Sequence, residues 1–190
     1  MSISIRFTGS GGQGAVLAGI IIARAVVLYD KKHATEKDGK FAIQTQSYGP
    51  EVRGSVTKSD IKISDEEIHY PYVKIPDIFI AMSEQAYNKY SKEIGNNTTV
   101  LIDKDLVKII PEVKYYEIPA NKIAKELGKE VVANIVMIGA LCGITNVTSK
   151  KSLESAVLEI VPKGTEDINK KALQKGYSLG KKLKNQYHNQ

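Results

Sequence analysis

The first 29 residues of the chain carry the pattern that most restricts its fold. Apolar side chains at Ile3, Ile5 and Phe7 alternate with polar ones, which predicts a β-strand. The strand runs directly into a glycine-rich turn, Gly9-Ser10-Gly11-Gly12-Gln13-Gly14, and the apolar side chains of residues 13–29 then follow helical spacing. A strand, a glycine turn and a helix in this order form the first half of a βαβ unit. The segment therefore predicts an α/β fold.

The remaining chain alternates between short apolar runs and longer segments with helical periodicity. Strands are expected at residues 56–64, 78–81, 100–102 and 113–118, and helices at residues 83–94, 121–141, 153–160 and from 165 onward. Residues 31–40 are polar, and we expect a loop there with at most a short strand near Ala34. The continuous apolar run at residues 78–81 is typical of the middle of a parallel sheet. We expect one domain over residues 1–190, a three-layer Rossmann-like α/β fold with a mostly parallel sheet.

The chain has a net charge of +6, and most of the excess lies at its C-terminal end. Residues 163–190 contain seven lysines against two acidic residues, Glu166 and Asp167. Lysines on a terminal helix usually mark a solvated face. The chain has no tryptophan and no aromatic residues interleaved with basic ones, so nucleic acid is not an expected partner.

Cysteine, histidine and hydropathy restrict the cofactors and the location. Cys142 is the single cysteine, so the chain by itself is expected to hold no disulfide, iron–sulfur cluster or cysteine-based zinc site. His33, His69 and His188 lack ligand spacing, and no bound metal is expected. The apolar residues 15–28 are too few and too polar to span a membrane, and no secretory signal precedes them. We expect a cytoplasmic protein that does not contact a membrane.

The glycine turn allows two interpretations. Its candidate residues are Gly9, Gly11, Gly12, Gln13 and Gly14. A phosphate-loop-like turn exposes backbone N–H groups to an anion, and dinucleotide binding also requires an acidic residue at the end of a second strand. Asp30 lies at a helix end beside two lysines, and no convincing strand precedes Glu36 or Asp38. The residues therefore favour close packing or another phosphate over a dinucleotide, and we expect that the isolated chain binds neither NAD nor NADP.

A second polar segment spans residues 44–54. Its Gly49-Pro50 turn signal fixes the backbone while polar side chains project from it. The candidate site residues are Gln46, Tyr48, Glu51 and Arg53. The alternative is a surface loop in which Glu51 pairs with Arg53. No serine–histidine–acid set accompanies the segment, so the catalytic residues stay unknown and a role by positioning and electrostatics at an interface is expected.

Taken together, these motifs resemble the gamma subunit of 2-oxoacid:ferredoxin oxidoreductases, the pyruvate/ketoisovalerate oxidoreductase gamma domain. The resemblance rests on the glycine turn, on residues 44–54, on Ser59-Asp60-x-Lys62-Ile63-Ser64 and on Val100-Leu101-Ile102-Asp103, and it covers nearly the whole chain. The form Ser47-Tyr48-Gly49-Pro50-Glu51 is most similar to the 2-oxoglutarate type. One departure is Ser55, which stands where a second glycine usually follows Gly54, and it affects the expected local backbone.

The resemblance implies a reaction and a set of partners. The reaction is the oxidative decarboxylation of a 2-oxoacid to acyl-CoA and CO2, with coenzyme A as cosubstrate and ferredoxin as the electron acceptor. Thiamine diphosphate, magnesium and iron–sulfur clusters are expected on alpha and beta subunits and, as a further candidate, a delta subunit. The isolated chain is then expected to be inactive, and the Tyr48–Arg53 loop to face a partner near the thiamine or coenzyme A site.

Two other functions stay open, and the sequence does not identify the 2-oxoacid. One is a subunit of an indolepyruvate ferredoxin oxidoreductase, which shares this region, and the other is a stand-alone nucleotide-binding protein. The isolated chain is expected to form a homodimer, because a subunit removed from its complex exposes an apolar patch. The lysine-rich last helix should lie outside that contact, since buried unpaired ammonium groups are costly.

Overall fold

The computed structural model describes residues 2–30, 40–47, 55–108 and 112–188. For residues 187 and 188 it describes the backbone only. The strands are β1 (Ser2–Ser10), β2 (Phe41–Ser47), β3 (Val56–Ser64), β4 (Ile78–Ala81), β5 (Thr99–Asp103) and β6 (Tyr115–Ile118). The α-helices are α1 (Ala15–Arg24), α2 (Glu84–Tyr90), α3 (Ala120–Glu126), α4 (Ala133–Thr145), α5 (Lys150–Ile160) and α6 (Glu166–His188). A π-helical turn, η1 (Ala25–Tyr29), continues α1, and short 3-10 turns lie at η3 (Ser91–Glu93) and η4 (Glu130–Val132).

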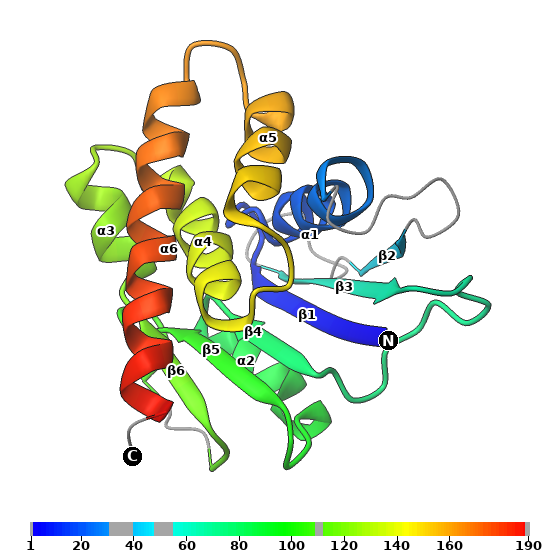
Figure 1. Cartoon of the computed structure of the whole chain (residues 1–190). Coiled ribbons are helices and arrows are strands. Elements are labelled where there is room, and N and C mark those ends of the chain that lie inside the picture. The colour runs from blue at the N-terminus through cyan, green and yellow to red at the C-terminus, as the bar shows by residue number, and fades with distance from the viewer. Residues whose placement is uncertain (1, 31–39, 48–54, 109–111, 189–190) are drawn as a thin grey trace.

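The described residues form one six-stranded sheet in the order β2-β3-β1-β4-β5-β6 (Figure 1). β1, β4, β5 and β6 pair in parallel, whereas β3 is antiparallel to both of its neighbours, β1 and β2. The prediction of a mostly parallel α/β sheet is therefore confirmed. The short apolar strand β4 lies inside this parallel part and is buried along its whole length, as expected.

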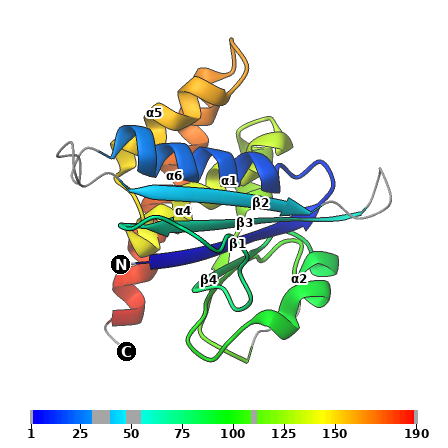
Figure 2. The same ribbon diagram turned by 90° about the vertical axis from the view of Figure 1, so that its right-hand side faces the viewer.

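Helices cover both faces of the sheet, which gives three layers. Figure 2 shows α1 and α5 on one side of the sheet and α2 on the other. The larger core lies under α1, α3, α4, α5 and α6, where Phe7 and Ile61 of the sheet meet Ile21 of α1. The smaller core lies under α2, where Phe79 and Ile102 contact the α2 tyrosines. The three-layer prediction is confirmed, with most of the helical mass on one face.

One expectation about the N-terminal half was wrong. Residues 41–47 form the strand β2 at the edge of the described sheet, although the sequence suggested a loop there. The polar side chains of β2 resemble those of a loop in the sequence. In the structure Gln44 does not face water, because it donates hydrogen bonds to Ser59 Oγ (2.7 Å) and to the Val16 carbonyl (3.0 Å). β1 has its parallel partner in β4, on the side away from β3. The strand expected near Ala34 lies outside the described residues.

The helical pattern over residues 121–141 covers two helices rather than one. α3 ends at Glu126 and α4 begins at Ala133, with Gly128 between them at a φ of 89°. That left-handed conformation suits glycine and ends α3. Nearby, the last strand is shorter than expected and begins at Tyr115. Among the described residues, no helix is both long enough and apolar enough to cross a membrane.

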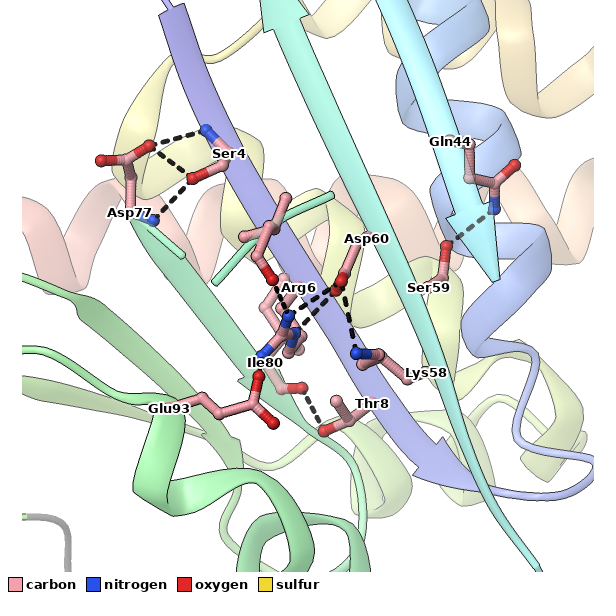
Figure 3. A network of polar contacts seen from close by, with 11 residues as sticks. Ser4, Arg6, Thr8, Gln44, Lys58, Ser59, Asp60, Asp77, Ile80 and Glu93 are labelled. Atoms are coloured by element: carbon pink, nitrogen blue, oxygen red, sulfur yellow. Dashed lines mark hydrogen bonds and ion pairs between the residues drawn. The ribbon is translucent and has the colours of Figure 1, made fainter. Parts of the chain in front are cut away.

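A buried group of charged side chains connects β1 to β3 on the face of the sheet that α2 covers (Figure 3). The fully buried Arg6 makes two hydrogen bonds to the Asp60 carboxylate, at 2.7 and 2.8 Å, and donates to the Val73 carbonyl at 2.6 Å. It also pairs with Glu93, and Lys58 lies 3.5 Å from Asp60. A buried guanidinium is tolerated because each of its sides meets an acceptor.

Candidate functional site

The glycine turn connects β1 to α1 at the carboxyl edge of the parallel strands. Gly12 and Gly14 have φ angles of 91° and 72°, so the turn uses a backbone conformation that other residues rarely adopt. The Gly11 N–H donates to the Ser55 carbonyl at 2.8 Å, and the Gln13 N–H donates to the Ser10 carbonyl at 3.1 Å. The turn is therefore fastened to Ser55, the residue that precedes β3.

The side chain of Gln13 fixes the conformation of the turn through two hydrogen bonds. Its Oε1 accepts from the Ser10 N–H at 2.7 Å, and its Nε2 donates to the Met82 carbonyl at 2.9 Å, just beyond the end of β4. A Cβ on Gly9 would lie 2.8 Å from this Oε1, which explains the glycine there. Three N–H groups of the turn, those of Ser10, Gly11 and Gln13, thus already have protein acceptors. The phosphate-loop interpretation stays a prediction, and the conformation itself is that of a packed turn.

Asn134 fixes the other end of the turn. It is buried in the first turn of α4, and its Nδ2 donates to the Gly14 carbonyl at 3.3 Å. A Cβ on Gly14 would overlap this amide, so the glycine is required by contact as well as by φ. The sequence analysis did not identify Asn134, because its partner lies 120 residues away in the chain.

A cleft of about 480 Å³ opens beside the turn. Gly12 and Gln13 follow β1, Met82 follows β4, Leu106 follows β5, and Asn121 and Lys125 belong to the helix after β6. Each parallel strand therefore contributes to the lining. Open α/β sheets bind ligands at this carboxyl edge, where the loops of neighbouring strands meet. This makes the cleft the candidate functional site of the described structure.

An apolar hollow of about 290 Å³ adjoins the cleft and shares Gly12 and Val131 with it. Leu17, Ile135 and Ile168 are among its lining residues. Val131 in η4 is 72% exposed and adds apolar surface at the border of the cleft and the hollow. The site thus combines a cleft with a mixed polar and apolar lining and an adjacent apolar surface.

Two carboxylates fix the start of α3, the helix that forms one wall of the cleft. Pro119 precedes α3 and its side chain cannot cap the helix, so the first N–H groups need other acceptors. Asp103, fully buried at the end of β5, accepts from the Asn121 N–H at 3.0 Å and from the Asp105 N–H at 3.1 Å. Asp105 accepts from the Lys122 N–H at 2.9 Å. The position of Asp103 directly after a buried strand is a signal that the sequence contained.

Replacing Asp103 by asparagine is expected to remove a pH-dependent part of the stability. Burial raises the pKa of the Asp103 carboxyl from 3.8 to about 6, although the hydrogen bonds from Asp105 and Asn121 lower it. Because the folded pKa exceeds the unfolded one, this group stabilises the fold most below about pH 4 and loses that contribution as the pH rises through about 6. A shift of this size corresponds to about 3 kcal/mol at most.

Urea unfolding between about pH 4 and about pH 7 measures this contribution. The difference in free energy of unfolding between the wild-type chain and Asp103→Asn should change across this range. Parallel pH curves for the wild type and Asp103→Asn would show that burial does not govern this carboxyl.

The second group of predicted site residues is only partly described. Gln46 lies near the exposed end of β2, opposite Ser59 of β3. Tyr48, Glu51 and Arg53 lie outside the described residues. Asp30 accepts a hydrogen bond from Thr148 Oγ at 3.2 Å. Among the described residues, no group of three or more His, Cys, Asp or Glu side chains could hold a metal ion.

The comparisons with known proteins agree on one family. The family model described as pyruvate ferredoxin/flavodoxin oxidoreductase matches residues 4–179. The chain belongs to this family. This confirms the resemblance drawn from the glycine turn and the second polar segment.

Individual relatives are similar over nearly the whole chain. The 2-oxoglutarate synthase subunit KorC of Methanocaldococcus jannaschii is 50% identical over 188 residues, which are 96% of each chain. The pyruvate synthase subunit PorC of Methanothermobacter marburgensis is 33% identical over 92% of this chain and 96% of its own. The crystal structure of a keto/oxoacid ferredoxin oxidoreductase gamma subunit from Geobacter sulfurreducens PCA superimposes with a TM-score of 0.81, at 39% identity over 94% of this chain and 95% of that chain.

Proposed function

We propose that the chain is the gamma subunit of a 2-oxoglutarate:ferredoxin oxidoreductase. The observation that carries the proposal is the 50% identity to a 2-oxoglutarate synthase subunit, against 33% for a pyruvate synthase subunit compared over a similar length. The complex would convert 2-oxoglutarate and coenzyme A to succinyl-CoA and CO2, and two electrons would pass to ferredoxin. A cytoplasmic location goes with this proposal.

The redox and decarboxylation cofactors belong to partner subunits in this proposal. Thiamine diphosphate supplies the electron sink for decarboxylation. Cys142 does not suit an iron–sulfur cluster, because it is buried and donates to the Thr148 carbonyl at 3.0 Å, and burial raises its pKa to about 11. Alpha and beta subunits, and a delta subunit as a further candidate, would carry thiamine diphosphate, magnesium and the clusters.

Reconstitution with the partner subunits tests this function. The complex should reduce ferredoxin with 2-oxoglutarate and coenzyme A faster than with pyruvate, 2-ketoisovalerate or indolepyruvate, and the isolated chain should be inactive. Preference for indolepyruvate would assign the chain to the competing enzyme. Micromolar binding of NAD by the isolated chain would favour the stand-alone nucleotide-binding protein. The neighbours of β1 support the prediction of no NAD binding, because β3 is antiparallel to β1 and the parallel strand β4 ends at Ala81 without an acidic residue.

The cleft beside Gly12 is proposed to face the partner's thiamine or coenzyme A site. Its support is its place at the carboxyl edge of the parallel strands, next to an exposed apolar side chain. Ser47 and Ser55, which precede and follow Tyr48–Gly54, lie on strand ends at this same edge, since Ser55 accepts from the Gly11 N–H. The role of Tyr48, Glu51 and Arg53 at this interface stays a prediction, as does the homodimer of the isolated chain.

Replacing Gln13 by alanine is expected to lower kcat/KM of the complex for coenzyme A by about tenfold, because small misplacements near a reacting centre have large effects on rate. The variant loses the bonds from Ser10 and to Met82 that fix Gly11 and Gly12 against β4. Steady-state kinetics of the complex measure the effect. Gln85→Ala, an exposed position on α2, is the matched control and should behave as the wild type. Equal kinetics for both variants would show that the turn does not contribute to the active-site surface.

A further inference from the structure

The outer face of α6 is a basic surface that the proposed site does not use. α6 contains 23 residues and is about 35 Å long. One side of it is buried through Ala172, Leu173, Gly176 and Gly180, and it lies along α4 with its other side uncovered (Figure 1). The exposed lysines on the outer side are Lys170, Lys171, Lys175, Lys181 and Lys182. Glu166 and Asp167 in the first turn are the acidic residues of α6, and none follows them, so Lys175, Lys181 and Lys182 have no opposite charge on neighbouring turns of α6.

Neighbouring elements do little to neutralise this lysine face. Lys175 lies 3.8 Å from Glu126 of α3, and both side chains are about half exposed. Within the described part of the chain, the other four lysines of the face have no carboxylate within 4 Å. Lys150 of α5 adds a further positive charge, since it and Lys181 both lie 5.7 Å from the ring centre of Tyr177. The face therefore has a positive potential along several turns of the helix.

We propose that the lysine face of α6 docks against an acidic surface of a partner subunit in the oxidoreductase complex. This proposal rests on the proposed function, because the partner is taken from that complex. A second copy of the chain is a poor occupant, since two lysine faces repel each other. A neutral partner is also a poor one, because it would bury ammonium groups without a counter-charge.

The composition of the face favours a protein over nucleic acid. Its charges are all lysines, whereas planar, bidentate recognition of phosphates favours arginine. Among the side chains that the structure describes on α6, the aromatic ring of Tyr177 is half-buried between two ammonium groups and is not displayed for stacking on bases. Charge pairs at the rim of an interface act mainly on the association rate and its salt dependence. Association of this subunit should therefore weaken as the ionic strength rises.

The charge-reversal variant Lys171→Glu/Lys175→Glu/Lys182→Glu tests the proposal with the purified partner subunits. Helical spacing places these three side chains on one stripe of α6. Sedimentation or calorimetry at about 0.05 M and about 0.5 M KCl should show at least about tenfold weaker binding than the wild type at low salt, with a reduced salt dependence. The control Lys74→Glu/Lys89→Glu/Lys92→Glu changes the net charge equally at exposed positions on other elements and should bind as the wild type.

The outcomes separate this proposal from the proposed function. A wild-type complex that oxidises 2-oxoglutarate, combined with unchanged binding by the α6 variant, overturns the docking surface alone. A wild-type chain that does not bind the partner subunits overturns both proposals. Tighter wild-type binding to a DNA duplex than to the subunits, lost in the α6 variant, would assign the face to nucleic acid and overturn the protein partner. Equal thermal unfolding of all three chains shows that the fold is intact.

Discussion

Replacing Asp60 by alanine is expected to lower the free energy of unfolding by about 3–5 kcal/mol, because it leaves a buried guanidinium without its main partner. Arg6 is fully buried, and Asp60 accepts two of its hydrogen bonds. Burial opposes the charge of Arg6, but the hydrogen bonds and charges of Asp60 and Glu93 outweigh it and raise the pKa of Arg6. Arg6 therefore stays charged, and it cannot escape the loss of Asp60 by giving up a proton.

Urea unfolding of a small series measures this effect. Arg24→Ala is the control, since the Arg24–Glu159 pair is about 40% exposed on both sides and should contribute at most about 1 kcal/mol. The double variant Arg6→Met/Asp60→Leu should recover part of the stability lost in Asp60→Ala, because no buried charge then remains unpaired at these two positions. A loss in Asp60→Ala no larger than that in Arg24→Ala would show that water reaches Arg6.

Adding a side chain at Gly176 is expected to be the other large perturbation. A Cβ there would overlap the Val136 carbonyl oxygen of α4, and α4 cannot move away because every residue from Ala133 to Ile144 is buried. Gly176→Ala should therefore lose about 3 kcal/mol of stability, even though alanine favours a helix by about 1 kcal/mol over glycine. Gly176→Val should lose more, since its branched side chain meets the same backbone.

Thermal and urea unfolding of both variants check this prediction, with the exposed Ser178→Ala on the same helix as the control. The control should stay within about 0.5 kcal/mol of the wild type. The expected order of stability is wild type, then Gly176→Ala, then Gly176→Val. A Gly176→Ala variant as stable as the wild type would show that α4 and α6 separate readily.

Local sequence pattern predicted the elements whose side chains follow one period and face one core. β3 and β4 begin and end where the alternation and the apolar run indicated, and the glycine turn joins β1 to α1 as expected. β2 was missed because its polar side chains bond to a neighbouring strand and helix, so its pattern resembles that of a loop. The apolar period alone does not mark the division into α3 and α4, because both helices continue it across Gly128.

The sequence by itself determined the α/β class, the turn at Gly9–Gly14 and the family, because these depend on neighbouring residues and on short motifs. Only the tertiary structure decided the strand order, the pairing of Arg6 with Asp60, the contact of Asn134 with Gly14 and the cleft lined from four strands. The two side-chain contacts join residues that are 54 and 120 positions apart. Their free energy comes from close packing and from satisfying buried polar groups, which no local pattern records.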